Sequence, residues 1–500
     1  PDRVEAYIDD GPALPLRRAL PRPDVPQPPG QPCGFEWLVP LPVGNEARSL
    51  TVRVRALGTQ GSAWYSPPTR IRYQPRTAQP GPAPLDLPRP VTRPPSSGDG
   101  RLVVLTHSLT IGGGQLYLQQ LLLRLMADEA FDVLVISPND GPLRAELEDA
   151  GIAVHVTRDY VVDPSQYAGA QVELRTLIRA WGADAVLANT LGTFPAVDVA
   201  TSEGIPTAWA VHESFELPVF QYLNWGERGL DPLVAGRMRH ALKVADLVVF
   251  EARATLELFA REIPELRAIV VPYGVAPGDI AAFKASIDRS QLRREAGFAE
   301  DDIVLLCVGV FEPRKAILGL LAAFDEIAAV YPRARLLLVG AHRSPYSESV
   351  AGATSGLPSR ERITIVEITP DIYPWYGIAD AIVSASDIES LPRSLLEAMT
   401  FGMPVVAAES FGTSELVVDG VTGFRCEANS HVSLCAALVR LLSLEDDDRR
   451  MMGARATGLV TELGGQDYHR DYAALIRQLM TARRSAGDTP TRAGDRLDHG

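Results

Sequence analysis

The stretch Ala381-Ile-Val-Ser-Ala-Ser-Asp-Ile-Glu-Ser-Leu-Pro-Arg-Ser-Leu-Leu-Glu-Ala-Met-Thr-Phe-Gly-Met-Pro-Val-Val-Ala-Ala408 decides the fold. It begins with an apolar strand, Ala381–Ser384, and continues through a polar loop that contains Pro392 to a helix, Leu395–Met399, that stops near Gly402. A second apolar strand starts at Pro404. Proline at the start of a helix and glycine just past its end are common boundary residues. The stretch therefore predicts a βαβ unit.

The same alternation of apolar strands and helix-length segments runs from about residue 101 to residue 460, in two series. The first predicts strands at Leu102–Leu105, Val133–Ser137, Ala185–Ala188, Thr207–Val211, Leu247–Phe250 and Ala268–Val271. The second predicts strands at Ile303–Val310, Arg335–Val339, Ile363–Val366, Ala381–Ser384 and Val405–Ala408. We therefore predict an α/β fold of two doubly wound, Rossmann-like lobes, 101–277 and 278–460, that face a cleft. Ligands bind beyond the carboxyl ends of such strands.

The segments outside the two lobes have different patterns. Residues 1–76 contain short alternating segments, such as Arg3–Ile8 and Thr69–Tyr73, between Gly, Pro and Asn turns, and predict a small all-β sandwich that is truncated from a longer protein. Residues 77–100 are rich in proline and predict a semi-extended linker. A C-terminal helix over 461–483 is expected to pack back on the first lobe, and the polar, Gly-rich residues 484–500 predict a disordered tail.

Composition excludes several classes of protein. Of the 500 residues, 46% are hydrophobic and 22% charged, and no apolar run approaches the about 18 residues of a membrane helix. A net charge of −14 disfavours nucleic acid as a partner. The four cysteines form no CxxC pair, so we expect neither a zinc site nor a disulfide framework, and a reducing cytoplasm as the location. The chain begins at Pro1, so a signal peptide can precede it.

The helix that follows Pro392 predicts an anion site. The backbone N–H groups of Arg393, Ser394 and Leu395 are free at its start, and such a terminus binds an anion without a side-chain charge. A diphosphate fits there. Glu389 precedes the helix and Glu397 lies in its first turns, so one carboxylate can meet a sugar while the other accepts from ribose hydroxyls. The alternative is that Glu389 only caps the helix and Glu397 is a solvated surface residue.

The run Glu389–Ala407, followed by Gly412-Thr-Ser-Glu415 and Asp419-Gly-Val-Thr-Gly423, closely resembles the signature of the family-4 retaining glycosyltransferases. These enzymes have the glycogen-synthase-like GT-B fold, and the resemblance covers about residues 101–480. It implies a hexosyltransferase-like enzyme that moves a sugar from a nucleotide diphosphate sugar to a saccharide acceptor, with retention at the anomeric carbon. It also implies a same-face route, in which the departing phosphate oxygen helps to deprotonate the attacking hydroxyl.

The resemblance also assigns roles to individual residues. It implies that Glu397 binds the donor ribose and that the amides near Ser394 and Leu395 bind the diphosphate. It implies that Glu389 lies beside the transferred sugar. The N-terminal segment is similar to accessory domains that precede some bacterial surface-polysaccharide transferases, which implies a role in polysaccharide or glycoconjugate biosynthesis and binding of an acceptor or partner.

Two cations follow the first strand of the second lobe, in Gly309-Val-Phe-Glu-Pro-Arg-Lys315, before a helix predicted over Ala316–Tyr331. A leaving nucleotide diphosphate gains negative charge as the glycosidic bond breaks, and Lys315 and Arg314 would stabilise that charge. The alternative is that both are exposed residues of a first helical turn. Members of the family often carry an arginine directly after the strand glycine, where this chain has Val310. The sequence therefore leaves open how Arg314 and Lys315 divide the stabilisation of the diphosphate charge.

Glycine-rich and histidine-containing loops follow strands of the first lobe. Gly112, Gly113 and Gly114 let the backbone approach a ligand closely, although the loop fits neither a dinucleotide fingerprint nor a Walker motif, and a tight strand–helix turn is the alternative. In the family this loop lies under the sugar and acceptor. His212 and the adjacent Glu213 end another strand.

A lone histidine is more often a hydrogen-bonded structural residue, but the resemblance places His212 near the sugar, in a positioning role. Asn189, Thr190 and Gly192 are weaker acceptor-loop candidates, and Gly274 in Val271-Pro-Tyr-Gly-Val275 is a candidate hinge.

Rival functions stay open at this point. The same fold serves nucleotide-sugar epimerases, and a catalytically dead glycan-binding protein would turn over nothing. A paired-carboxylate hydrolase is disfavoured, because two glutamates in one strand–helix turn do not establish that they flank a glycosidic bond. Asp387-Ile-Glu389 could hold a divalent ion, but Ser394, Arg314 and Lys315 would already neutralise the diphosphate.

We expect no cofactor and no metal. The expected partners are a nucleotide-sugar donor, a saccharide or lipid-linked saccharide acceptor at the inner face of the membrane, and further domains of a longer chain.

Overall fold

The computed structural model describes the strands of the first 73 residues as backbone, and residues 100–157, 163–226, 229–465 and 467–487, with side chains to residue 483. Most of the predicted linker 77–100 and the part of the predicted tail beyond residue 487 lie outside the described residues. The chain divides into two compact units, Pro1–Leu85 with Leu217–Pro232, and Asp86–Glu216 with Leu233–Gly500. Each unit is described by itself.

The first unit contains antiparallel strands and one helix, α5 (Leu217–Trp225). The strands are β1 (Arg3–Ile8), β2 (Leu14–Pro15), β3 (Ala19–Leu20), β4 (Gly34–Phe35), β5 (Arg48–Leu57), β6 (Ala63–Tyr65) and β7 (Thr69–Tyr73). They form a five-stranded sheet, in which β1 and β5 are central, and a separate β3–β4 pair. The predicted strands Arg3–Ile8 and Thr69–Tyr73 are present, whereas two stacked sheets, and so a sandwich, stay a prediction.

The N-terminal lobe is built on a seven-stranded parallel sheet with the order β10-β9-β8-β11-β12-β13-β14. Its strands are β8 (Gly100–Leu105), β9 (Phe131–Ser137), β10 (Ala153–Val156), β11 (Ala185–Asn189), β12 (Thr207–Val211), β13 (Leu247–Phe250) and β14 (Ala268–Val270). The central strands β11 and β12 are buried along their whole length. Strands covered on both faces need continuous apolar sequence, which is why the sequence pattern located them well.

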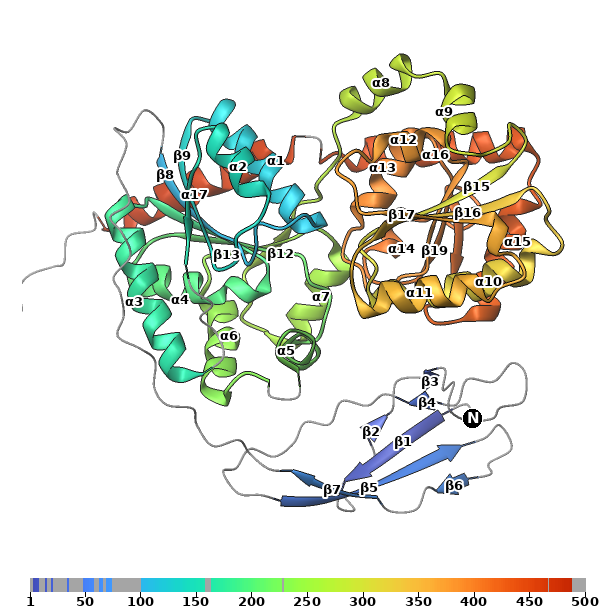
Figure 1. Ribbon diagram of the computed structural model, residues 1–500. Helices are drawn as coiled ribbons and strands as arrows, with labels where there is room; N and C mark the ends of the chain where they lie inside the picture. The colour runs from blue at the N-terminus through green and yellow to red at the C-terminus, as the bar shows by residue number, and fades with distance from the viewer. Residues whose placement is uncertain are drawn as a thin grey trace, which may run out of the picture. The chain divides into compact units, whose positions relative to one another are not determined.

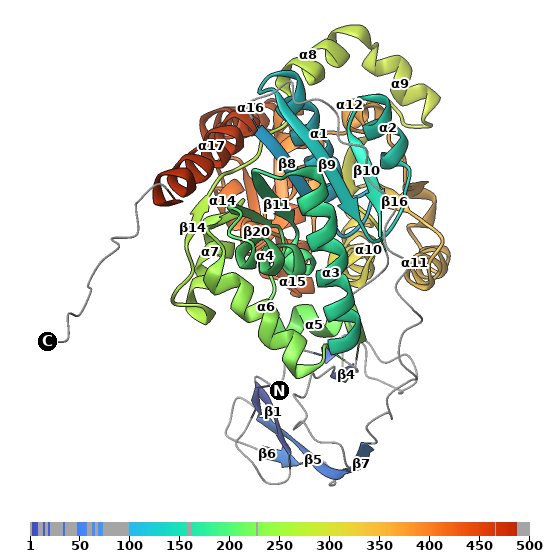
Figure 2. The same ribbon diagram turned by 90° about the vertical axis from the view of Figure 1, so that its left-hand side faces the viewer.

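Helices cover both faces of this sheet (Figure 1). α1, α2 and α17 lie on one face, and α3, α4 and α6 lie on the other, as Figure 2 also shows from the side. The helices are α1 (Gly113–Ala127), α2 (Leu143–Asp149), α3 (Pro164–Trp181), η1 (Leu191–Thr193), α4 (Phe194–Ser202), α6 (Pro232–Val244) and α7 (Arg253–Glu262).

The C-terminal lobe repeats the design with a six-stranded parallel sheet of order β17-β16-β15-β18-β19-β20. Its strands are β15 (Ile303–Val308), β16 (Ala334–Ala341), β17 (Ile363–Glu367), β18 (Ala381–Ser384), β19 (Val405–Ala408) and β20 (Gly423–Cys426). This strand order is that of the dinucleotide-binding Rossmann fold. The predicted α/β fold with two Rossmann-like lobes is therefore confirmed.

Two groups of helices cover the C-terminal sheet. One face packs against α12 (Tyr373–Ile378), α13 (Arg393–Phe401) and α16 (Asp446–Leu463). The opposite face packs against α10 (Ile317–Ala328), α11 (Pro345–Ser355) and α15 (His431–Leu442). The remaining elements of the lobe are α8 (Pro277–Ser286), α9 (Arg289–Glu295), η3 (Pro313–Lys315), η4 (Arg360–Arg362) and α14 (Thr413–Leu416).

The chain returns to the N-terminal lobe at its end. α17 (Tyr468–Gly487) packs beside α1, where the Tyr468 hydroxyl donates to the Tyr117 carbonyl at 3.1 Å. It continues to Gly487, beyond the predicted helix end at 483, so residues 484–487 are helical. Every helix among the described residues is too short or too polar to span a bilayer.

Candidate active site

The predicted site residues follow the strands at which each sheet reverses its order. In the C-terminal sheet this switch lies between β15 and β18, and Lys315 and Glu389 follow these strands. In the N-terminal sheet it lies between β8 and β11, which lead to Gly113 and Asn189. Ligands of open α/β sheets bind at such switch points. The topology therefore places candidate residues from both lobes at ligand-binding positions.

Lys315 and Glu389 form a buried ion pair across the C-terminal switch point. The Lys315 ammonium donates to Glu389 Oε1, and the side chains are 15% and 10% exposed. Arg314 Nη1 lies 3.6 Å from the same oxygen, and its Nε donates to Glu312 at 2.8 Å. The alternative of exposed first-turn cations is therefore wrong for Lys315. Glu389 binds these cations and does not cap the helix α13.

The electrostatics of Glu389 follow from this pairing. Burial by itself raises the pKa of a carboxyl group, because it disfavours the charged form. The Lys315 and Arg314 cations outweigh that effect and hold the pKa of Glu389 below its ordinary value. The Glu389 carboxyl group therefore favours its charged form in this pair. An incoming diphosphate would meet two cations that Glu389 already holds in place.

A short turn sets the direction of Lys315. The residues Pro313–Lys315 form the 3-10 turn η3, and Ala316 then adopts a left-handed conformation with φ of 50° before α10 starts. Lys315 folds back over Gly309, where an added Cβ would lie 3.2 Å from Lys315 Cε. The predicted helix start at Ala316 is thus displaced to Ile317. Since Val310 carries no charge, Arg314 and Lys315 supply the positive charge of this loop.

The start of α13 is uncapped by any side chain, as an anion site requires. For the backbone N–H groups of Arg393 and Ser394, the described residues offer no acceptor. The Leu395 N–H, however, donates to the Pro392 carbonyl at 3.0 Å. The prediction of a free Leu395 amide is therefore wrong, because the first turn tightens on Pro392. The helix ends at Gly402, whose φ of 93° is a left-handed conformation that favours glycine.

Glu397 is buried, so the alternative of a solvated surface residue is wrong. Its Oε1 accepts from Arg393 Nε at 2.8 Å, and its Oε2 accepts from the Tyr376 hydroxyl at 2.9 Å. Burial and the Glu397 carboxylate raise the pKa of Tyr376 well above its usual value, so the hydroxyl remains a donor. Arg393 Nη1 also donates to Gln120 of α1 at 3.0 Å. A carboxylate offers about four lone-pair sites, so Glu397 retains capacity for ribose hydroxyls.

His212 is held on both sides of its ring. Its Nδ1 pairs with the Glu251 carboxylate, and its Nε2 lies 2.7 Å from Asn189 Oδ1. Burial lowers the pKa of His212, but Glu251 and then Glu213 raise it, and the net shift is upward. Because both ring nitrogens are already engaged, the imidazole is not free to act as a general base in this arrangement. The positioning role of His212 stays a prediction.

The glycine loop of the N-terminal lobe lies beside this histidine. α1 begins at Gly113 without a side-chain cap, and no atom outside the helix backbone comes within 4 Å of a Cβ built on Gly113. A Cβ built on Gly114 would lie 3.8 Å from His212 Cδ2. The loop thus leaves open space next to His212. Glu213 supports the neighbouring loop by accepting from the Leu191 N–H at 2.9 Å.

Three residues of the site were missed by sequence reasoning. Glu251 follows β13, and its position at the carboxyl end of a strand is a signal that could have found it. Tyr376 of α12 and Gln120 of α1 reach the site from helices. A search for polar residues at the carboxyl ends of strands therefore could not find them.

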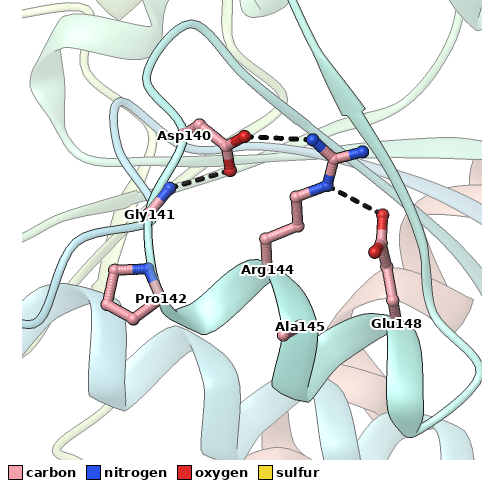
Figure 3. A pocket seen from close by; sticks show the side chains of 6 residues that line it. All are labelled: Asp140, Gly141, Pro142, Arg144, Ala145 and Glu148. Carbon is pink, nitrogen blue, oxygen red and sulfur yellow. Dashed lines mark hydrogen bonds and ion pairs between the residues drawn. The ribbon is translucent and has the colours of Figure 1, made fainter.

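A pocket also opens at the end of β9, where Arg144 pairs with Asp140 at 3.0 Å and Glu148 at 2.9 Å (Figure 3). It contains none of the predicted residues.

Direct hydrogen bonds join the two lobes beside the candidate residues. The Tyr273 hydroxyl donates to the Leu391 carbonyl at 2.8 Å, and Thr255 Oγ1 lies 3.2 Å from Ser390 Oγ. Glu415 accepts from the Ala254 N–H at the start of α7 at 2.8 Å, so a side chain of one lobe caps a helix of the other.

The two segments that connect the lobes are also bonded to each other. The N–H of Gly274, the predicted hinge, donates to the Gly465 carbonyl at 2.7 Å.

Two Rossmann-like lobes with paired switch-point sites are the architecture of the GT-B class, to which nucleotide-sugar transferases belong. Family models agree with this class. The model described as "Glycosyltransferase Family 4" matches residues 111–278, and that described as "Glycosyl transferases group 1" matches residues 288–458. The chain belongs to the family-4 glycosyltransferases, and it is an enzyme of that kind.

Curated relatives align with about half of the chain. The "Lipopolysaccharide 1,2-N-acetylglucosaminetransferase" of Salmonella typhimurium is 29% identical over 265 residues, which are 50% of this chain and 67% of that protein. The "GDP-mannose-dependent alpha-(1-6)-phosphatidylinositol monomannoside mannosyltransferase" of Mycolicibacterium smegmatis is 28% identical over 266 residues, 51% and 67% of the two chains. A "D-inositol 3-phosphate glycosyltransferase" of Nocardia farcinica is 30% identical over 259 residues, with 49% of this chain and 56% of the relative covered.

Solved structures show the same fold. HepE of Anabaena, in complex with UDP and glucose, superposes with a TM-score of 0.62 at 21% identity, and covers 77% of this chain and 100% of its own. The sucrose-phosphate synthase of Thermosynechococcus elongatus gives a TM-score of 0.61 at 20% identity, with 77% and 100% covered.

Proposed function

We propose that this enzyme transfers a hexosyl unit from a nucleotide diphosphate sugar to a saccharide acceptor with retention at the anomeric carbon. The observation that carries the proposal is the juxtaposition at the C-terminal switch point. There Lys315 and Arg314 lie beside Glu389, which the chain connects directly to the open start of α13. Fixed cations and free amides stabilise a departing diphosphate more as its charge develops, which is how such a site would accelerate transfer.

The route proposed for retention is a same-face displacement, because a double displacement would need a carboxylate nucleophile and the candidate carboxylates are already paired. Among the described candidates, Glu389 is tied to Lys315, and Glu397 is tied to Arg393 and Tyr376. Neither carboxylate is thus available to form a glycosyl ester. In the proposed step the acceptor hydroxyl attacks on the face from which the diphosphate leaves, and a phosphate oxygen of the leaving group takes its proton.

The acceptor is proposed to lie against the N-terminal switch point. His212, Asn189 and the open loop at Gly113 and Gly114 form its wall. Asn189 is fully buried, and its Nδ2 has no hydrogen-bond partner among the described residues, so an unsatisfied donor lies directly behind this wall. Relatives that act in lipopolysaccharide and phosphatidylinositol mannoside synthesis support a glycan or lipid-linked glycan as the acceptor class, in surface-polysaccharide or glycoconjugate biosynthesis in the cytoplasm.

We further propose that transfer requires no metal. Glu389 is occupied by Lys315, so a divalent ion held by Asp387 and Glu389 would displace an existing ion pair. Excess EDTA should leave donor turnover unchanged, whereas Lys315→Ala should raise the barrier by about 2–4 kcal/mol. Loss of activity in EDTA and its recovery with Mg²⁺ or Mn²⁺ would contradict metal independence.

The decisive experiment presents a panel of nucleotide sugars and saccharide acceptors to the full chain. Transfer is followed by mass spectrometry, and the anomeric configuration of the product by proton NMR. We expect a glycosylated acceptor in which the transferred sugar has the same anomeric configuration as in the donor. An inverted product would refute retention. Release of an epimerised sugar without any acceptor would identify an epimerase, and donor binding without turnover would identify a glycan-binding protein with a dead site.

A further inference from the structure

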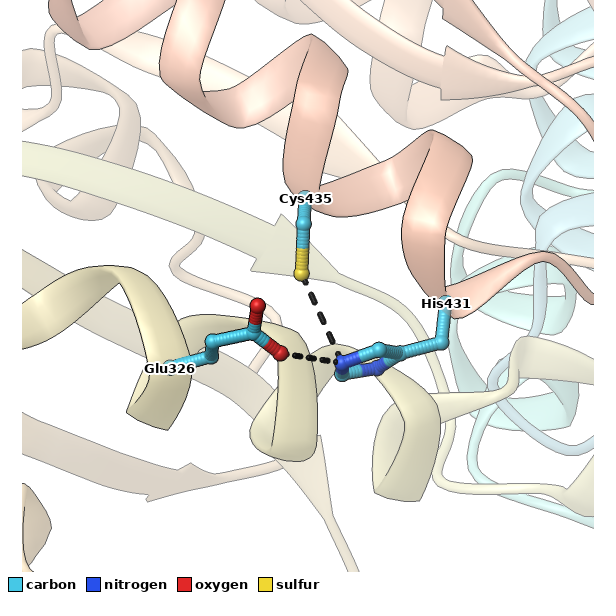
Figure 4. Close-up of side chains that lie close together, drawn as sticks. All are labelled: Glu326, His431 and Cys435. Atoms are coloured by element: carbon cyan, nitrogen blue, oxygen red, sulfur yellow. Dashed lines mark hydrogen bonds and ion pairs between the residues drawn. The ribbon is translucent and has the colours of Figure 1, made fainter. Parts of the chain in front are cut away.

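Three potential metal ligands meet on the C-terminal lobe, on the face of the sheet opposite to α13. They are Glu326 of α10 and His431 and Cys435 of α15 (Figure 4). Their ligand atoms all lie within 4.8 Å of one another, and they are the one such trio among the described residues. We propose that these three residues bind a divalent transition ion of the zinc class.

The distances between the ligand atoms suit such an ion. Zinc bonds of about 2.3 Å to sulfur and about 2.0–2.2 Å to nitrogen or oxygen, at tetrahedral angles, separate the ligand atoms by roughly 3.3–3.6 Å. Cys435 Sγ lies 3.6 Å from His431 Nε2, which already meets that requirement. Glu326 Oε2 lies 2.7 Å from the same nitrogen and must withdraw by less than about 1 Å. Its side chain is 65% exposed, so it has room to do so.

The ligand types select the class of ion. Thiolate and imidazole ligands favour zinc and its neighbours, whereas magnesium and calcium prefer oxygen ligands. Binding breaks the S–H bond of Cys435, forms a sulfur–metal bond and releases one proton to solvent. With three protein ligands, a water molecule completes the tetrahedron.

Both helices hold their ligands before any ion binds. His431 and Cys435 are four residues apart on α15 and therefore share one face of that helix. α15 and α10 bury leucines and Phe324 against each other in a common core. The Cys435 thiol is kept at this interface by a contact of 3.8 Å with the Ala323 carbonyl.

The simpler interpretation is an exposed ion pair between Glu326 and His431, which would contribute about 0–1 kcal/mol. It does not account for a largely buried thiol directed at the same imidazole nitrogen. A metal that tied α10 to α15 would stabilise the lobe. None of its three ligands is among the residues proposed for transfer, so the role of the metal would be structural.

The test uses the full chain, purified with a chelator and titrated with Zn²⁺ in competition with a chromogenic chelator. Even an outer partner of a metal ligand contributes about 10–100-fold to affinity. His431→Ala and Cys435→Ser should therefore each weaken binding by at least about tenfold. The matched control is His240→Ala, because His240 is also exposed and lies on a helix outside the cluster. This variant should bind like the parent.

Two further readouts keep the proposal testable. Co²⁺ should give a thiolate-to-metal charge-transfer band that disappears in Cys435→Ser, and Zn²⁺ should raise the thermal midpoint of the parent but not that of His431→Ala. Circular dichroism verifies that each variant is folded. Absence of binding at micromolar Zn²⁺, or equal affinity in the parent and both ligand variants, would overturn the proposal. Donor turnover is measured separately from metal binding. The outcome of the turnover assay therefore bears only on the proposed function, and not on the metal site.

Discussion

Replacing Lys315 by methionine tests the central feature of the site, the buried pair of Lys315 and Glu389. Methionine keeps much of the side-chain volume and removes the charge. The change leaves the Glu389 carboxylate, 10% exposed, with Arg314 as its remaining cation at 3.6 Å. Breaking a buried pair on one side costs roughly 3–5 kcal/mol of unfolding free energy. Because Arg314 compensates in part, we expect the lower end, about 3 kcal/mol.

The same change should slow transfer. Loss of one preorganised group that stabilises developing charge costs about 2–4 kcal/mol of barrier. That corresponds to roughly 30- to 1,000-fold in turnover. A double variant, Lys315→Met with Glu389→Gln, removes both charges. It should recover much of the stability and none of the turnover, which separates the two roles of the pair.

The pH dependence provides a second signature. The pKa of Glu389 is lowered in the parent, so its contribution to stability is complete above the ordinary glutamate value and is lost as the pH falls through the lowered value. In Lys315→Met the burial of Glu389 is opposed by Arg314 alone, so its pKa rises relative to the parent. The stability deficit of the variant should therefore be larger at neutral pH than at mildly acidic pH, where its carboxyl group takes up a proton more readily than that of the parent.

The assay combines thermal unfolding at neutral and at mildly acidic pH with steady-state donor turnover. The control is Lys243→Met, which removes an exposed lysine from its pair with Glu265 at 3.1 Å and should change stability by less than about 1 kcal/mol. If Lys315→Met were no less stable and no slower than this control, the buried pair would be neither a structural nor a catalytic element.

Three further variants test other parts of the structure. Glu397→Ala should weaken donor binding by about tenfold or more, since each charge-assisted bond contributes about 1.5–3 kcal/mol; unchanged affinity in calorimetry would refute the ribose assignment. Deletion of residues 1–98 should leave donor affinity intact, and loss of soluble expression or of donor binding would make that segment part of the catalytic core. Gly412→Ala should lower the thermal midpoint, because its Cβ would lie 1.7 Å from the Ser390 carbonyl oxygen, whereas Gly319→Ala in α10 meets no neighbour and should raise it slightly.

The fold was predictable where strands are covered on both faces. Thr207–Val211 and Ala381–Ser384 have the predicted bounds, because each is a short apolar run that ends at polar loop residues. The edge strands β10 and β20 were missed. Each has four residues, and β10 is only half-buried, so neither has the continuous apolar sequence of the central strands.

The site was predictable at strand ends and less so elsewhere. Lys315, Glu389 and His212 follow strands, and the structure places each of them at a switch point or beside one. Their partners come from distant segments: Glu251 is 39 positions from His212, and Gln120 is 273 positions from Arg393. Tertiary packing brings these pairs together, and no local sequence pattern indicates which residues will pair.

The two connections between the lobes constrain how this enzyme can move. The chain passes from one lobe to the other near Gly274 and returns near Gly465, and the backbones of these crossings are bonded to each other at 2.7 Å. Two bodies joined by adjacent tethers can rotate about the tethers but cannot slide apart. A rotation of the lobes about these crossings would break the hydrogen bond from the Ala254 N–H, at the start of α7, to Glu415 of the other lobe.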